Sequence, residues 1–195
     1  MKDWQHLDEQ MRRYKNRLIA EVKLTPRIAD TLATAIEQDV LLLSTQQKQQ
    51  IRDASPIAPA DRLAELQCFQ SWLDIVHDIP MKDPVLTRAE IMAQNYMCFV
   101  YLPEACFSVL ARVCASASAT RKCSQFLTKN PVRAFRNSIA HANWTYRKDF
   151  KAIEYWSKRH HNDELLERFE VEQKDLTFWQ ALSKCVAYVM YSSLE

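Results

Sequence analysis

Three side chains that can donate hydrogen bonds lie close together in the stretch RNSIAHANW, which runs from Arg136 to Trp144. They belong to Arg136, Asn137 and His141, and most of their neighbours are small or apolar. Such a cluster of donors has the chemistry to meet a partner molecule. The spacing alone carries little weight, because a histidine shortly after an arginine is expected about once by chance in a chain of this composition.

The geometry of a helix indicates which of these residues share a face. At about 100° per residue, Val132, Phe135 and Ile139 fall on one face of a helix. Asn137 and His141 are four residues apart and share the opposite face. We therefore expect His141 to point away from the core.

The outward face of this helix has two interpretations. Arg133 and Ala140 lie beside Asn137 and His141, with Arg136 on the flank, and alanine is small enough to let another backbone approach. This arrangement favours a contact surface. The alternative is an ordinary exposed helix face, whose histidine lies near the helix end, where a cation is favoured.

Charge is distributed unevenly, although the formal net charge is only +2. From Arg121 to Arg159 there are ten Lys or Arg residues against two Asp or Glu residues, and the remainder carries 16 basic and 22 acidic residues. A basic segment in an otherwise acidic protein is expected for a partner that is a polyanion, such as nucleic acid. A solvated basic surface is the alternative.

The composition favours a mainly α-helical fold. The chain has 195 residues and no glycine, whereas hairpin turns and sheet loops draw heavily on residues that accept positive φ. Helical bundles can be connected by turns made of Asn, Asp, Ser and Pro. We therefore expect one all-α domain over residues 1–195.

Apolar residues recur at helical spacing in several segments of the first half. They predict helices over 4–22, 25–43, 63–80 and from Asp83 onward, the last kinked or restarted at Pro103. The polar run Ser44–Ala60 is rich in Gln and contains two prolines, so it is predicted to be a connecting loop.

The second half predicts a short helix, a hairpin and a last helix. Asn130-Pro131 begins the helix that carries the RNSIAHANW stretch. The β-prone segments Ala152–Trp156 and Arg168–Glu172 predict one small β-hairpin. The last helix is expected over about Asp175–Ser192.

The cysteines and the apolar stretches indicate where in the cell the chain is expected to work. The six cysteines form no CxxC pair, and the chain opens with Met1-Lys2-Asp3-Trp4 rather than an apolar signal, which favours buried thiols and a cytoplasmic location. The most apolar stretch, Ile91–Ala119, is interrupted by polar residues and proline. It is therefore predicted to be the central core helix rather than a membrane span.

The motif from Arg136 to His141 resembles the signature of the HEPN superfamily, the higher eukaryotes and prokaryotes nucleotide-binding domains. Members share an arginine, often followed by a polar residue, and then a histidine after four to six positions, on an all-helical bundle. The extended form through Trp144, with Phe178-Trp179-Gln180 in the last helix, resembles a bacterial stand-alone subfamily.

This resemblance implies a metal-independent endoribonuclease, commonly a toxin or defence protein, that works as a homodimer with the two motifs facing each other. RNA cleavage by its own 2′-hydroxyl needs proton transfer, for which His141 is suited, and stabilisation of a pentavalent phosphate, for which Arg136 is suited. Asn137 would orient His141 or bind phosphate. Among the other basic residues, Arg133, Arg147 and Lys148 are expected to bind the RNA.

One departure from the family bears on regulation. In one toxin branch a tyrosine two residues after the histidine is modified by a nucleotidyltransferase antitoxin, but here that position is Asn143, and Tyr146 is displaced. An antitoxin partner acting by that route is therefore not expected. Some family members have lost catalysis, so a catalytically silent RNA-binding or regulatory domain is the alternative function.

No cofactor and no metal are expected. The chain has no Walker loop, no GxSxG and no glycine-rich dinucleotide fingerprint. His160-His161 with Asp163 and Glu164 lacks the spacing of zinc ligands.

Overall fold

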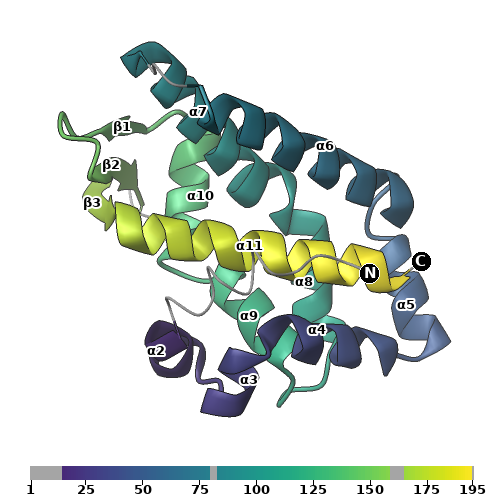
Figure 1. Cartoon of the computed structure of the whole chain (residues 1–195). Coiled ribbons are helices and arrows are strands. Elements are labelled where there is room, and N and C mark those ends of the chain that lie inside the picture. The colour runs from purple at the N-terminus through teal and green to yellow at the C-terminus, as the bar shows by residue number, and fades with distance from the viewer. Residues whose placement is uncertain (1–14, 80–82, 159–164, 195) are drawn as a thin grey trace.

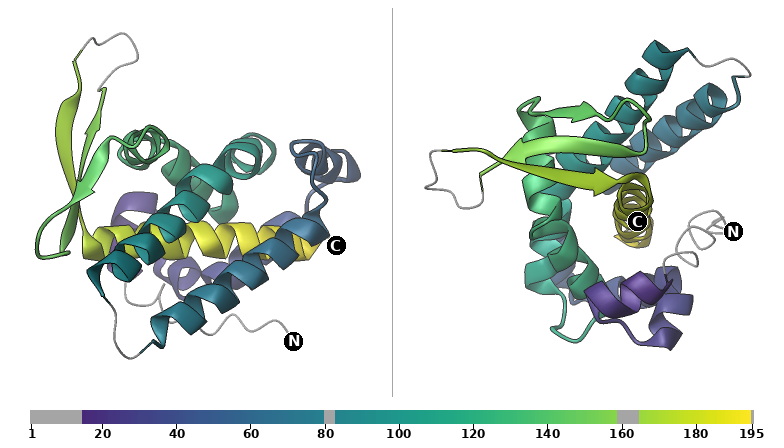
Figure 2. Two further views of the ribbon diagram at one scale, coloured as in Figure 1. Left: turned by 90° about the horizontal axis from the view of Figure 1, so that it is seen from above. Right: turned by 90° about the vertical axis from the view of Figure 1, so that its left-hand side faces the viewer.

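The computed structural model describes residues 15–79, 83–158 and 165–194. It consists mainly of helices, with a small antiparallel sheet beside the start of the last helix (Figures 1 and 2). The expected all-α bundle with a hairpin before the last helix is confirmed. The start of the predicted first helix and the residues His160, His161, Asp163 and Glu164 lie outside the described residues.

The helices follow one another along the chain with short connections. Their bounds are α2 (Lys15–Arg17), η1 (Leu18–Val22), α3 (Pro26–Asp30), α4 (Leu32–Leu41), α5 (Thr45–Arg52), α6 (Pro59–His77), α7 (Pro84–Tyr96), η2 (Met97–Tyr101), α8 (Pro103–Val113), α9 (Ala119–Thr128), α10 (Val132–Ala140) and α11 (Gln173–Leu194), of which η1 and η2 are π-helical.

The last helix, α11, is the centre of the bundle. It crosses the middle of the molecule with α6 on one side and α4 on the other (Figure 1), and nearly every residue from Leu176 to Leu194 is buried. Small residues such as Ala181, Ser183 and Ala187 are fully buried and let other helices approach closely. A helix that is apolar or small on all sides belongs in a core.

The prediction that Ile91–Ala119 forms the central core helix is therefore wrong. That stretch is divided among α7, the π-helical turn η2 and α8, and the last of these ends at Val113. The predicted restart at Pro103 is confirmed, because proline fits the first turn of α8. In the described part of the chain, no single helix is long and apolar enough to cross a membrane; the bent pair Pro84–Tyr101 and Cys106–Val113 passes by length and composition only.

Local signals place several helix starts. The side chain of Thr25 accepts a hydrogen bond from the Ile28 amide at 3.3 Å, and that of Asp83 accepts one from the Leu86 amide at 2.6 Å. In each case a proline occupies the first helical turn. These are the cap-plus-proline starts that the sequence predicts.

The predicted loop Ser44–Ala60 is wrong in its first half, which forms α5. Ser44 and Gln47 make a reciprocal capping box, with hydrogen bonds of 3.2 and 2.9 Å. Ile51 then buries its side chain against the core. Glutamine is a good helix former, and both prolines come only after α5 has ended, so polarity alone was a misleading signal.

The sheet contains the predicted hairpin and one further strand. Strands β1 (Trp144–Tyr146), β2 (Ala152–Ser157) and β3 (Glu167–Glu172) pair antiparallel in that order, with Trp144 opposite Tyr155 and Tyr155 opposite Phe169. Strand β3 leads directly into α11, which places the sheet at one end of the bundle (Figure 2). The edge strand β1 starts three residues after His141 and ties the motif to the sheet.

Candidate functional site

Helix α10 presents the motif with the orientation that its periodicity predicts. Val132, Phe135 and Ile139 are buried, whereas Arg133 and His141 are exposed. Phe135 is fully buried and meets three aromatic rings edge-on, those of Phe99, Tyr155 and Trp179, at centroid distances of 5.3, 5.3 and 5.8 Å. These contacts fix the rotation of α10, so its polar face must point outward.

That polar face forms one wall of a pocket of about 590 Å³. Side chains at intervals of three to four residues along α10 line this wall, and the end of β2 with the residues around it lines the other. The lining residues are Asn130, Arg133, Ala134, Asn137, His141, Asn143, Trp156, Ser157, Lys158 and Leu166. The volume lies within the range of roughly 300–1,000 Å³ found for small-molecule sites. We call this space the His141 pocket.

The chain leaves α10 through a left-handed turn that sets the position of His141. His141 is the C-cap, and Ala142 adopts φ 56°. The amide of Asn143 donates to the Ser138 carbonyl at 2.8 Å, and the amide of Ala142 donates to the Ile139 carbonyl at 3.2 Å. This pair of bonds defines a Schellman motif, in which glycine usually occupies the left-handed position.

Two hydrogen bonds then join the end of α10 to β2. The hydroxyl of Ser138 donates to the carbonyl of Trp156 at 2.8 Å, and the amide of Trp156 donates to the carbonyl of Asn143 at 2.9 Å. Ser138 precedes His141 in the chain, and Asn143 follows it. The backbone of Trp156 therefore joins the two walls of the His141 pocket at two points, in addition to the ring contact of Phe135 with Tyr155.

The His141 pocket is rich in hydrogen-bond donors and in groups that can carry positive charge. Arg133 and Lys158 bring side-chain cations, His141 brings an imidazole, and Asn130, Asn137 and Asn143 bring amides. Within the described residues, no Asp or Glu lines it. A concave site with this lining suits an anion that carries several acceptor oxygens, such as a phosphate.

Arg136 lies beside the pocket rather than in its lining. Its guanidinium donates to the amide oxygen of Asn137, at 3.0 Å from Nη2 and 3.3 Å from Nε. With its oxygen engaged in this way, Asn137 has its amide NH₂ with which to donate into the pocket. Arg136 thus sets the role of Asn137 from the flank.

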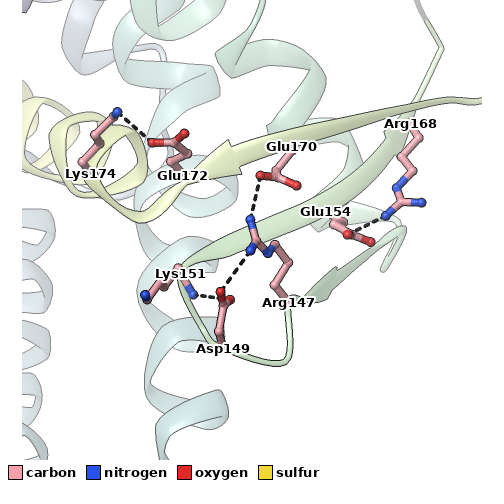
Figure 3. A network of polar contacts seen from close by, with 8 residues as sticks. All are labelled: Arg147, Asp149, Lys151, Glu154, Arg168, Glu170, Glu172 and Lys174. Carbon is pink, nitrogen blue, oxygen red and sulfur yellow. Dashed lines mark hydrogen bonds and ion pairs between the residues drawn. The ribbon is translucent and has the colours of Figure 1, made fainter.

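Two of the expected RNA-binding residues lie elsewhere. Arg147 and Lys148 are in the connection between β1 and β2, next to Ala152 at the start of β2, whereas the His141 pocket is at the end of β2. Six strand residues separate these ends, a span of roughly 17 Å at about 3.3 Å per residue. Arg147 is also paired with Asp149 at 3.0 Å and with Glu170 at 3.3 Å (Figure 3).

Among the pocket residues that reasoning from the sequence missed, Asn130, Asn143 and Lys158 bring amide or ammonium donors. Asn130 was interpreted only as part of a helix start, Asn143 only as a replacement for a tyrosine, and Lys158 only as one charge in the basic segment. A signal for Asn130 was present, because it continues the spacing of Arg133, Asn137 and His141 toward the N-terminus. Lys158 could not be found in this way, since the fold alone brings it to α10.

The aromatic residues that follow the motif have structural contacts. Trp144 is half-buried and meets Tyr146 edge-on at 5.2 Å. Burial raises the pKa of Tyr146, and its hydroxyl is buried without a hydrogen-bond partner among the described residues. Tyr146 is therefore a poor target for a modifying enzyme.

The Phe178-Trp179-Gln180 segment also serves the core. The Trp179 ring packs edge-on against Phe99 and Phe135. The amide of Gln180 donates to the side-chain oxygen of Asn95 at 2.7 Å, and both residues are buried. Through Trp179, this segment packs against the buried face of α10.

Comparison with known proteins returned no relative. No protein-family model, no curated protein and no solved structure matches the chain. The HEPN resemblance accordingly rests on the motif and the order of the elements. Within the described residues there is also no group of three or more His, Cys, Asp or Glu side chains that could hold a metal ion.

Proposed function

We propose that the chain is a metal-independent endoribonuclease of the HEPN type, with the scissile phosphate of RNA bound in the His141 pocket. The observation that carries this proposal is the lining of that pocket, where His141, Asn137, Arg133 and Lys158 meet without a carboxylate among the described residues. Phosphate contacts supply most of the affinity of nucleic-acid-binding proteins, and positively charged side chains make them.

The proposed reaction is an attack by the RNA's own 2′-hydroxyl on the adjacent phosphorus. The 2′-oxygen gives up its proton as it forms the new O–P bond, and the bond from phosphorus to the 5′-oxygen breaks as that oxygen receives a proton. The products are a 2′,3′-cyclic phosphate and a free 5′-hydroxyl. His141 performs one of these proton transfers, and cations stabilise the charge on the pentavalent phosphate.

Each cationic group has a role in the proposed reaction that follows from its position. Arg133 and Lys158 hold the phosphate from opposite walls of the pocket. Arg136 adds its charge from the flank and orients the Asn137 amide through the bond of 3.0 Å. The second proton transfer falls to His141 of a second copy of the chain, which faces the first across the exposed Ala140. The proposed enzyme is therefore a homodimer with a composite site.

A catalytically silent RNA-binding domain is the second candidate, and one observation favours it. The imidazole of His141 is exposed and makes no hydrogen bond to a described residue that would fix its tautomer. Catalytic histidines are usually oriented by such a partner. Arg133, Lys158 and the amides would still bind RNA.

The cellular setting follows from the resemblance alone. We place the activity in the cytoplasm, as a toxin or defence protein. An antitoxin, if it acts by modification, would need a target other than Tyr146, whose hydroxyl is buried.

The test is cleavage of single-stranded RNA by the purified protein in excess chelator. The proposal expects product ending in a cyclic phosphate, and a loss of rate of about a hundredfold to ten-thousandfold in His141→Ala with nearly unchanged RNA affinity. His77→Ala is the matched control, because His77 is exposed at the end of α6, outside the pocket lining. Binding without cleavage by the wild type would establish the silent domain instead.

Substitutions at Arg136 examine the second half of the mechanism. Arg136→Ala should lower both cleavage rate and affinity. Arg136→Lys should recover affinity better than rate, because lysine keeps the charge but loses the fork of donors that reaches Asn137. Equal recovery of both would argue against a geometric role for the guanidinium.

The composite site requires a dimer. Sedimentation should show a species near twice 22.9 kDa. Ala140→Trp should weaken association and cleavage together, because it adds bulk to the exposed face beside His141. A strict monomer that still cleaves RNA would show that one pocket suffices.

A further inference from the structure

A second pocket of about 360 Å³ adjoins the His141 pocket and has a different chemistry. The two pockets share Asn130, Ala134 and Lys158 in their linings. Beyond these shared residues, the second pocket is lined by Pro131, Tyr155 and Phe169, which are apolar or aromatic. A donor-rich pocket is therefore continuous with a ring-lined one.

The two rings of the second pocket form a fixed platform. Tyr155 and Phe169 are cross-strand partners of β2 and β3, and their rings stack at 5.4 Å with planes inclined by 23°. Tyr155 is buried, and its ring also meets the buried Phe135 edge-on at 5.3 Å. Phe169 is only partly buried and stacks against this supported ring. The platform needs no ordering before a ligand binds, which favours affinity.

We propose that this second pocket is a nucleobase subsite, in which a base stacks on Phe169 while the phosphate of the same nucleotide lies in the His141 pocket. This inference rests on the proposed function, because that function places the phosphate. A flat aromatic ring beside a cluster of phosphate-binding donors is the combination that proteins use to hold single-stranded nucleic acid.

The shared polar residues fit the same ligand. Lys158 lines both pockets. It can therefore bind the phosphate of a nucleotide whose base occupies the second pocket. The side-chain amide of Asn130 both donates and accepts hydrogen bonds, so it can pair with the edge of a stacked base. Stacking tolerates every base, whereas an amide selects by donor and acceptor pattern. The subsite therefore binds any nucleotide and gives a modest preference among bases.

The experiment compares the binding of 5′-nucleotides and of ribose 5-phosphate to the full chain by NMR titration. In wild type the nucleotides should bind more tightly than the sugar phosphate. Phe169→Leu should lower nucleotide affinity by about fivefold to a hundredfold, the range typical of losing one base stack. It should leave ribose 5-phosphate affinity unchanged. Phe169→Tyr keeps the ring and should retain nucleotide binding.

Phe69→Leu is the matched control, because it makes the same substitution at a partly buried ring on α6, outside the linings of both pockets. Thermal unfolding of each variant separates loss of the ring from loss of the fold. Equal wild-type affinity for nucleotide and sugar phosphate, absence of nucleotide binding, or no effect of Phe169→Leu in a folded protein would each overturn the subsite.

The outcomes for the subsite and for the enzyme are distinct. Nucleotide binding that depends on Phe169, without RNA cleavage, leaves the subsite standing and removes the ribonuclease. RNA cleavage with no dependence of nucleotide binding on Phe169 leaves the ribonuclease standing and removes the subsite.

Discussion

The hydroxyl of Ser138 lies 2.8 Å from the backbone carbonyl oxygen of Trp156 and donates a hydrogen bond to it. Ser138 is the third residue of the RNSIAHANW stretch and is buried, whereas Trp156 is near the end of β2. This bond is one of the contacts that join the two walls of the His141 pocket. The serine of the motif is thus a structural link, and its neighbours carry the donors.

Ser138→Ala should lower the free energy of unfolding by about 1–3 kcal/mol, because the part-buried carbonyl of Trp156 loses the hydroxyl that donates to it. RNA affinity should fall as well, since one of the two hydrogen bonds between Trp156 and the α10 end of the chain is lost. Urea unfolding and RNA titration measure the two effects. Ser124→Ala is the matched control: its buried hydroxyl has no partner among the described residues, so its removal should cost little. Equal costs for the two serines would refute the link.

Ala142→Gly should raise the free energy of unfolding by about 0.5–1 kcal/mol. Ala142 has φ 56°, a left-handed conformation that a Cβ disfavours and glycine accepts without strain. Ala140→Gly, two residues earlier and helical, should instead lower it by roughly the same amount. Thermal or urea unfolding of both variants gives the opposite signs, and the same sign for both would mean that the turn is not left-handed in solution.

Removing the positive charge of Lys158 should weaken RNA binding more than removing that of Lys148. Both lysines are exposed members of the basic segment, but only Lys158 lines the His141 pocket. We expect Lys158→Gln to reduce RNA affinity. The slope of log affinity against log salt concentration should also become shallower by about one, because one fewer counterion is released on binding. Fluorescence anisotropy at several salt concentrations measures both. A larger loss in Lys148→Gln would place the RNA at the other end of β2.

The cysteines should differ sharply in reactivity. Cys68 is exposed, whereas the other five are buried, and burial raises the pKa of Cys98 to about 11 and that of Cys114 to about 12. At pH 8 only about one Cys98 in a thousand would be a thiolate, the form that reacts. A colorimetric thiol reagent should therefore titrate one thiol in the folded chain and six in urea, and Cys68→Ser should abolish the fast reaction.

The same raised pKa values give a pH dependence of stability. Because folding raises the Cys98 pKa from its ordinary 9.0 to about 11, the unfolded chain loses its proton first as pH rises. The contribution of the Cys98 thiol to the free energy of unfolding is therefore full below pH 9 and is lost between pH 9 and 11. Urea midpoints measured across this window should fall with pH, and Cys98→Ala should fall less steeply.

The buried amide pair Asn95 and Gln180 should show strong coupling. Gln180→Met leaves the side-chain oxygen of Asn95 without its donor, so we expect a loss of about 1–3 kcal/mol in the free energy of unfolding. Adding Asn95→Leu should restore part of that loss, because no unpaired acceptor then remains. Urea unfolding of both single variants and of the double variant completes a double-mutant cycle. Purely additive losses in the free energy of unfolding would contradict the pairing.

The sequence by itself determined those features that are encoded within a few neighbouring residues. The starts of α3 and α7 follow from Thr25 and Asp83 with the prolines that come after them. The outward direction of His141 follows from the apolar period of Val132, Phe135 and Ile139, because one buried face fixes the other. The β2–β3 hairpin follows from its β-prone segments, although the short edge strand β1 has too weak a pattern to be predicted.

The tertiary structure alone decided which segments far apart in the sequence meet. Apolar content pointed to Ile91–Ala119 as the centre, but α11 takes that place because its small residues admit neighbours on every side. Arg147 and Lys158 look equivalent in the sequence, yet the strand between them carries them to opposite ends of β2. The contacts of β2 with the α10 end of the chain, among them Ser138 with Trp156 and Phe135 with Tyr155, bring Lys158 to the helix of His141, and such long-range contacts leave no local trace in the sequence.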